Sequence, residues 1–454
     1  MYRFFQSWRR ELILLVLAAC PLPQALAGLP IQHWTHASGA KVYLVESPGI
    51  PMVDVQIDFD AGGRRDPRDK AGLASVTAGM ASKGVEADGV FPALGENALS
   101  EAWADLGASF GASASADRMS FMLRSVTLED LLPRAVQLAA RQLGQPTFPA
   151  EVWRRERERL VASLREANTR PATIVARSFS AAVYRQHPYG YEMTEASLAP
   201  VEVDDMRRLY RNLIVACRAK VSIVGAVSRA QAERLVTNLL ARLPAADRSG
   251  VCEALPVVPE IAPLTEAYEL RVPFDSAQAQ LMLGQPGIRR NDPDFFAITV
   301  GNYILGGGGF VSRLNEEVRQ KRGLSYSVYS YFSPGLHAGA FTVGLQTRPD
   351  QAMQALGVAR EVVQRFVADG PTAAELQAAK ANLVGGFALL IDSNRKLLGN
   401  VANIAWSELP LDYLDNWTRR VDAVSLEDVR AAFARHLQPQ RMVTVLVGAR
   451  EPGS

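Results

Sequence analysis

The sequence has little excess charge and few cysteines. Its 49 basic and 47 acidic residues leave a formal net charge of +2, so composition points to neither nucleic acid nor an anionic membrane surface as a partner. Only three cysteines are present. Without Cys20, which lies in the first 27 residues, Cys217 and Cys252 remain, too few for a disulfide scaffold. A single bridge between them would fit an oxidising compartment, but the sequence does not place it.

Long hydrophobic runs are also missing. After residue 27 no segment approaches the ~20 apolar residues of a transmembrane helix. The first 27 residues indicate an export signal, because three arginines precede the apolar run 12–19 and Ala-Leu-Ala at 25–27 forms a small-residue cleavage site. Leu-Ala-Ala-Cys at 17–20 also fits a lipoprotein cleavage box, in which Cys20 would carry the lipid. We therefore expect a periplasmic or otherwise exported protein, either soluble or anchored through Cys20.

Familiar catalytic motifs are absent as well. The sequence contains no Gly-x-Ser-x-Gly, and none of its cysteines lies in a nucleophile motif. None of its five histidines belongs to a pair on a predicted helix, since His33 and His36 fall in an expected loop and the others, His187, His337 and His436, are isolated in sequence. A lone histidine is usually a satisfied structural group unless its pKa is perturbed or it is clustered with other ligands. No metal site is therefore expected among them.

What is present is a long, duplicated pattern. A chain of 454 residues is too long for one ordinary core. Residues 198–228 align with 421–450: each segment has an amphipathic helix and a strand ending in Val-Gly-Ala. A period of ~200 residues is a duplicated domain rather than a solenoid, and helices beside antiparallel strands predict an α+β fold in each half. We expect domains at 28–246 and 267–450, joined by a linker at 247–266.

The first half also shows its elements individually. Hydrophobic periodicity predicts helices and strands, with Thr127 or Asp130 capping the third of the helices. The helices are expected over 69–83, 98–106, 128–143, 151–168 and 203–213, and strands over 118–126 and 219–224.

The stretch 304–332 combines a glycine run, a short charged helix, a turn at Gly323 and an alternating strand. Arg319 ends the helix and Tyr326 begins the strand, so both side chains can reach one space across the turn. A phosphate loop is disfavoured, because Lys-Ser/Thr does not follow Gly309. On spacing alone, the glycines only allow close backbone approach, and Arg319 and Tyr326 are surface groups.

The amino-acid identities within residues 304–332 favour another interpretation. S-R-L-x-x-E-V-R-x-K-R-G-L-x-Y-S-V resembles the second-half signature of the pitrilysin/insulinase-type zinc peptidases, which include the mitochondrial processing peptidase. The resemblance implies two similar α+β halves that close like a clam around peptide substrate. It also implies that Arg319 and Tyr326, at the matching positions, reach the peptide bond being cut.

Active members of this family carry H-x-x-E-H on the helix after a G-x-R-x-D/E-P segment, with both histidines on one helix face for zinc. The segment is present at 62–67. At the ligand positions the chain reads Ser75, Ala78 and Gly79, so both histidines and the catalytic glutamate are replaced. A serine nucleophile at Ser75 would need a base within reach, and no neighbouring histidine is evident.

The family's third ligand is a glutamate seven residues after the glutamate of a Glu-Arg pair. Counting from Glu156 gives Ser163. The alternative pair, beginning at Glu158, gives Arg165, which is no better ligand. The resemblance thus implies a degenerate zinc site at Ser75, Ala78, Gly79 and Ser163, and no cofactor in this chain.

Residues 107–114 are rich in small side chains and resemble the family's edge strand. There Ala112, Ser113 and Ala114 would pair with an extended peptide, although an ordinary small-residue turn fits equally well.

Two functions follow from the resemblance. In some relatives the active site is split between subunits, one carrying H-x-x-E-H and the other the Arg/Tyr pair. The chain resembles the second kind and is expected to be inactive alone, with Arg319 and Tyr326 acting in trans beside a zinc-bearing homologous partner. The alternative is a stand-alone peptide-binding or chaperone-like protein without catalysis.

Overall fold

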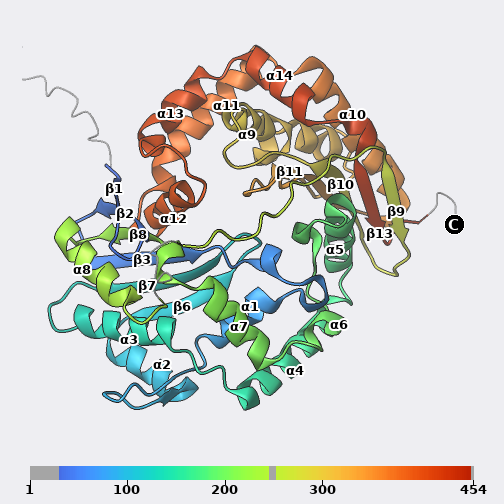
Figure 1. The fold of residues 1–454 in the computed structure, drawn as a ribbon. Helices are drawn as coiled ribbons and strands as arrows, with labels where there is room; N and C mark the ends of the chain where they lie inside the picture. Colours follow the sequence, from blue (N-terminus) through green and yellow to red (C-terminus); the bar gives the residue numbers. More distant parts are fainter. Residues whose placement is uncertain (1–29, 245–251, 451–454) are drawn as a thin grey trace, which may run out of the picture.

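The computed structural model describes residues 30–244 and 252–450. Two halves, each a mixed β-sheet with helices, close into a ring (Figure 1). Within these ranges no helix is both long and apolar enough to cross a membrane. The expected export signal and Cys20 lie outside the described residues.

The N-terminal half is built on a six-stranded sheet of order β1-β2-β8-β3-β7-β6, in which β2 and β8 run parallel. A short ribbon of two strands lies beside it. The strands are β1 (Gln32–Thr35), β2 (Lys41–Glu46), β3 (Met52–Phe59), β4 (Gly84–Val85), β5 (Leu94–Gly95), β6 (Ser109–Ala114), β7 (Met119–Val126) and β8 (Lys220–Gly225). The helices are α1 (Leu73–Met80), α2 (Glu96–Asp105), α3 (Leu132–Gly144), α4 (Ala150–Ala167), α5 (Pro171–Tyr184), α6 (Glu195–Leu198), α7 (Val203–Leu213) and α8 (Arg229–Leu240).

The C-terminal half has a five-stranded sheet of order β11-β12-β10-β13-β9, in which β9 and β13 run parallel. The strands are β9 (Tyr268–Val272), β10 (Ala279–Pro286), β11 (Ser327–Phe332), β12 (Ala340–Thr347) and β13 (Val443–Val447). The helices are α9 (Phe295–Asn302), α10 (Ala352–Asp369), α11 (Ala373–Gly386), α12 (Asn394–Trp406), α13 (Tyr413–Ala423) and α14 (Leu426–His436). Strand for strand, this order matches β6-β7-β3-β8-β2 of the first half. The two α+β halves are therefore duplicates, and β6 and β11 are corresponding edge strands.

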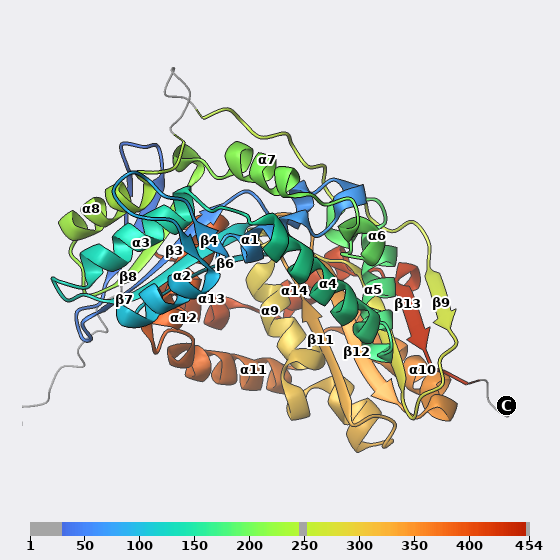
Figure 2. The same ribbon diagram turned by 90° about the horizontal axis from the view of Figure 1, so that it is seen from below.

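Each half lends one helix to the other's sheet (Figures 1 and 2). Helix α5 lies on β10 and β13, where Val175, Phe179 and Val183 are buried against strand residues such as Val443 and Val445. Helix α12 lies on β3 and β8, in a cluster that includes Leu398, Val401, Tyr43 and Val224. Because each fully buried apolar side chain contributes about 1.5–3 kcal/mol, these two contacts hold the halves together.

Charged groups reinforce the α12 contact. Arg118 donates to Asp58 at 3.1 Å, to the carbonyl of Ala402 at 3.3 Å and to the side chain of Asn403 at 2.8 Å. Lys220 donates to the carbonyls of Ala405 and Trp406 at 3.1 and 3.2 Å. A cation at the C-terminal end of a helix satisfies carbonyls that have no partner within the helix.

The start of α1 is organised by Asp66, within the G-x-R-x-D-P segment. Its carboxylate accepts from the backbone N–H groups of Gly72 and Ala74, both at 2.9 Å. Burial raises the pKa of Asp66 to about 7, although these hydrogen bonds act in the opposite direction. Gly72 has a φ of +100°, a left-handed conformation that favours glycine. The carboxylate and the glycine together fix where the helix begins.

The two cysteines form a disulfide, which the sequence alone left open. Cys217 and Cys252 are bonded, with their Cα atoms 6.0 Å apart and a sequence separation of 35 residues. The bridge ties the segment after residue 252 to the turn that precedes β8.

Two local expectations differ from the structure. Thr127 and Asp130 do not cap α3, because the helix begins at Leu132, after Leu131. The helix expected over 69–83 is split into a 3-10 turn at Arg68–Lys70 and α1, because the left-handed Gly72 interrupts the helical path.

Candidate functional site

Arg319 and Tyr326 stand on either side of the predicted turn. Arg319 lies in a π-helical segment, Asn315–Gln320, and Tyr326 immediately precedes β11. Gly323 between them has a φ of +61°, which a side chain would strain. The hydroxyl of Ser325 donates to the carbonyls of Ser327 and Gln346, both at 2.7 Å. These bonds fix the backbone next to Tyr326 against the sheet.

The structure brings the two predicted side chains together. The guanidinium carbon of Arg319 lies 4.4 Å from the ring centre of Tyr326 and 4.6 Å from that of Phe310. Both rings are exposed, Tyr326 by 76% and Phe310 by 64%. Such cation–π contacts hold a cation in place without neutralising it. Sequence reasoning did not identify Phe310 as a partner of Arg319.

The pair opens on a cavity of about 680 Å³ between β11 and the glycine run. Its lining includes Gly306, Gly307, Phe310, Arg319 and residues 326–331. A Cβ on Gly306 would collide with the backbone and hydroxyl of Ser330. The glycine run therefore allows the backbone to approach β11 closely, as expected from the sequence.

In the N-terminal half, Ser75 and Gly79 are exposed on one face of α1, one turn apart, whereas Ala78 is buried. They line a cavity of about 280 Å³ together with Lys83, Glu156 and other residues. No atom would meet a Cβ added to Gly79 within 4 Å. This is the helix face on which a histidine pair would meet a metal.

Helix α4 contributes Glu156 and Arg159 to this cavity, and Ser163 is not among its lining residues. Sequence counting used Glu156 only as its starting point. Glu156 accepts from Arg159 at 2.6 Å and lies 3.4 Å from the ammonium of Lys83. Burial opposes ionisation, but these cations hold the pKa of Glu156 below its usual value. A geometric criterion could have identified Glu156, because it is a carboxylate that faces Ser75 and Gly79, the two positions where active relatives have histidines.

The residues present do not fit a zinc ion. A zinc site needs at least three donors such as imidazole or carboxylate. The cavity offers one carboxylate, already paired with Lys83 and Arg159, and the hydroxyls of Ser75 and Ser82.

The expected peptide-pairing residues Ala112, Ser113 and Ala114 lie in β6, which among residues 30–244 and 252–450 pairs with β7 alone and ends the N-terminal sheet. Ser113 is exposed, and Ala112 and Ala114 are half-buried. The position at an edge is what pairing with an extended peptide requires.

His187 has the expected structural role, although its ring contacts that of His337, with the ring centres 4.9 Å apart. Its Nδ1 accepts from the backbone N–H of Tyr189 at 3.1 Å, and its Nε2 lies 3.0 Å from the carbonyl of Pro259. Burial, and then the nearby His337, lower the pKa of His187. His187 is therefore a neutral capping residue at neutral pH.

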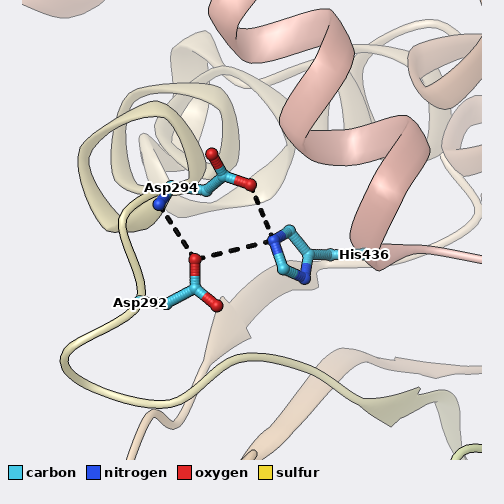
Figure 3. A group of neighbouring side chains, drawn as sticks. All are labelled: Asp292, Asp294 and His436. Atoms are coloured by element: carbon cyan, nitrogen blue, oxygen red, sulfur yellow. Dashed lines mark hydrogen bonds and ion pairs between the residues drawn. The ribbon is translucent and has the colours of Figure 1, made fainter.

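His436 does lie in a cluster, with Asp292 and Asp294 (Figure 3). Its Nε2 is 2.8 Å from Asp294 and 3.7 Å from Asp292. Asp294 also pairs with Arg435, and Asp292 accepts from the backbone of Asp294 at 2.9 Å. These groups already satisfy one another at the start of α9, so we assign them a structural role.

The protein has two lobes, which are duplicated halves that exchange one helix each. One half holds the Arg/Tyr cavity, and the other presents a helix face without metal ligands. These features define a metallopeptidase-like fold. Family models agree: residues 41–197 match the insulinase family, peptidase family M16, and residues 200–383 match the peptidase M16 inactive domain. The chain belongs to the insulinase family.

Several relatives span almost its full length. A crystal structure of a peptidase M16 inactive domain from Pseudomonas fluorescens is 33% identical, has a TM-score of 0.87 and covers 93% of this chain and 99% of its own. The uncharacterized zinc protease YmxG of Bacillus subtilis is 24% identical over 92% of this chain and 98% of its own. The non-peptidase homolog YmxG of Helicobacter pylori is 24% identical over 93% and 96%. The family thus contains proteins described as proteases and proteins described as non-peptidases.

Proposed function

We propose that this chain is an exported, zinc-free subunit of an insulinase-type peptidase. It supplies Arg319 and Tyr326 to substrate held by a homologous partner that carries H-x-x-E-H. The observation that carries the proposal is the asymmetry between the halves. The donor pair lines an open cavity, with Tyr326 exposed and Arg319 half-buried, whereas the helix face for zinc presents Ser75 and Gly79.

The chemistry of the pair suits this task. Hydrolysis of a peptide bond develops negative charge on the carbonyl oxygen, and donors fixed at that position stabilise the transition state. The guanidinium supplies charge and a fork of donors, and the phenol supplies one hydroxyl. In this mechanism Arg319 and Tyr326 bind and orient the substrate. The H-x-x-E-H residues of the partner would hold zinc, which would supply the activation of water.

Export and inactivity of the chain alone rest on further observations. The first 27 residues have the pattern of an export signal, with Cys20 as the alternative lipid anchor, and a disulfide such as Cys217–Cys252 persists in oxidising compartments. The name of the Helicobacter pylori relative, a non-peptidase homolog, supports inactivity of the chain by itself.

A second function is a stand-alone peptide-binding protein. The observation in its favour is that both sheets end in edge strands, β6 and β11, which can bind extended peptides without any catalysis.

The test begins with an exported homologue that carries intact H-x-x-E-H and is encoded beside this chain. Co-purification would be followed by a peptidase assay of each chain and of the mixture. The proposal predicts a complex, and turnover by the mixture only. Full turnover by the partner alone would contradict it, and peptide binding without any complex would favour the second function.

A further inference from the structure

The cavity beside Arg319 has the features of a binding site for a negatively charged group. Lys321 and Arg322 pair with Glu317 at 2.7 and 2.5 Å. By contrast, no carboxylate among residues 30–244 and 252–450 forms an ion pair with Arg319. The lining of the cavity contains no acidic residue and several hydroxyl groups. Arg319 is thus a fixed cation without a counter-charge at the side of an open groove.

A second polar group faces the same cavity. Asn315 is 5% exposed and lines the groove, and its Oδ1 accepts no hydrogen bond within the described ranges. A buried acceptor without a donor costs about 1–3 kcal/mol. Asn315 and Arg319 are four residues apart in one helical segment and line the same cavity. A ligand on the guanidinium therefore lies beside Asn315, whose side chain must turn for its buried Oδ1 to accept an N–H.

We infer that this groove binds the C-terminal carboxylate of an extended peptide. A peptide's last residue carries a carboxylate and, two bonds away from its carbon, a backbone N–H. Arg319 binds the carboxylate by two parallel hydrogen bonds, and Asn315 accepts from the N–H.

The inference rests on the proposed function for the peptide nature of the ligand, and it names a product of that reaction. When water attacks the scissile carbonyl and the C–N bond breaks, the amine leaves with a proton and the attacked carbon becomes a carboxylate carbon. Donors that hold the developing oxyanion thus hold the new carboxylate of the N-terminal fragment. This chain would retain that fragment after cleavage.

The test measures peptide binding by the full mature chain alone, without partner or turnover. The probe is fluorescein-labelled Ala-Ala-Leu-Ala-Phe, prepared as the free acid and as the C-terminal amide, and the readout is fluorescence anisotropy. We expect the acid to bind at least about tenfold more tightly than the amide, because a charge-assisted hydrogen-bonded pair is lost in the amide. Arg319→Gln should reduce this ratio to about 1.

Two variants complete the design. Asn315→Leu, which keeps the branched shape of the side chain and removes its acceptor, should weaken both peptides by about tenfold but preserve the acid-to-amide ratio. Lys321→Gln is the matched control, since its ammonium is paired with Glu316 and Glu317, and it should bind like the wild type. Equal binding of acid and amide by the wild type, or no binding of either, would overturn the inference. Either result could coexist with activation in trans, so the two proposals fail separately.

Discussion

The face of α1 that presents Ser75 and Gly79 should accept a grafted zinc site. We predict that Ser75→His combined with Gly79→His gains zinc binding, with Glu156 as the third ligand. Both positions are exposed and lie one helical turn apart, and Gly79 has open space for a side chain. Two histidines at this spacing share one helix face and bind one metal ion.

The expected affinity follows from the surroundings. Complete four-ligand zinc sites are worth about 10–16 kcal/mol. Zinc must displace Lys83 from Glu156, an attraction of about 5 kcal/mol at 3.4 Å with an effective dielectric constant of about 20. The binding free energy that remains after this attraction is subtracted, for a site with three ligands, corresponds to a dissociation constant on the order of 1 μM. Lys83 keeps a partner after displacement, because Glu96 lies 2.5 Å from its ammonium.

Isothermal titration with zinc chloride measures this affinity. Adding Glu156→Gln to the double variant should weaken binding by about 100-fold or more, since a carboxylate ligand is removed and its neighbouring cations stay. Adding Ser163→Ala should have no effect. A folded double variant that binds no zinc would refute the reasoning. An effect of Ser163→Ala without one of Glu156→Gln would place the third position at Ser163.

Three further predictions concern stability and substrate capture. Replacing Cys217 and Cys252 by serine should lower the free energy of unfolding by about 4 kcal/mol, because the bridge closes a loop of 35 residues; denaturant titration with and without a reductant measures it. Burial raises the pKa of Asp66 to about 7. The contribution of this side chain to the free energy of unfolding should therefore be complete below pH ~4 and be lost as the pH rises through 7, a loss of about 4 kcal/mol relative to Asp66→Asn. Denaturant titrations of the wild type and Asp66→Asn from pH 4 to 8 measure this loss. Equal slopes of the unfolding free energy against pH in the two proteins would contradict the prediction. Ala112→Pro removes a donor from edge strand β6 and should weaken peptide binding at least about fivefold; unchanged affinity in a folded variant would remove β6 from substrate capture.

The duplication and the α+β class were predictable, because residues 198–228 and 421–450 repeat a helix-to-strand pattern that local periodicity reveals. The exchange of α5 and α12 between the halves was not. An amphipathic helix shows that it buries one face, but its sequence does not tell which sheet receives that face.

The candidate site divides in the same way. The closeness of Arg319 and Tyr326 follows from a short turn at Gly323, which sequence spacing indicates. Glu156 lies about 75 residues from Gly79 along the chain, and only tertiary packing brings α4 beside α1. Counting residues from Glu156 led instead to Ser163, which lies two helical turns farther along α4 and is exposed.

Arg319 and Tyr326 are proposed to act in trans. The most direct test is the turnover number of the complex between the zinc-bearing partner and Tyr326→Phe. That change deletes one exposed hydroxyl, so folding and assembly should be retained. Tyr268→Phe, a 46%-exposed tyrosine on β9, is the matched control.

We expect an assembled complex whose turnover falls about 10²–10³-fold with Tyr326→Phe, similarly with Arg319→Ala, and not at all with Tyr268→Phe. Assembly is checked by gel filtration of each mixture before the assay. Full turnover by an assembled Tyr326→Phe or Arg319→Ala complex would contradict the account and leave the chain a scaffold.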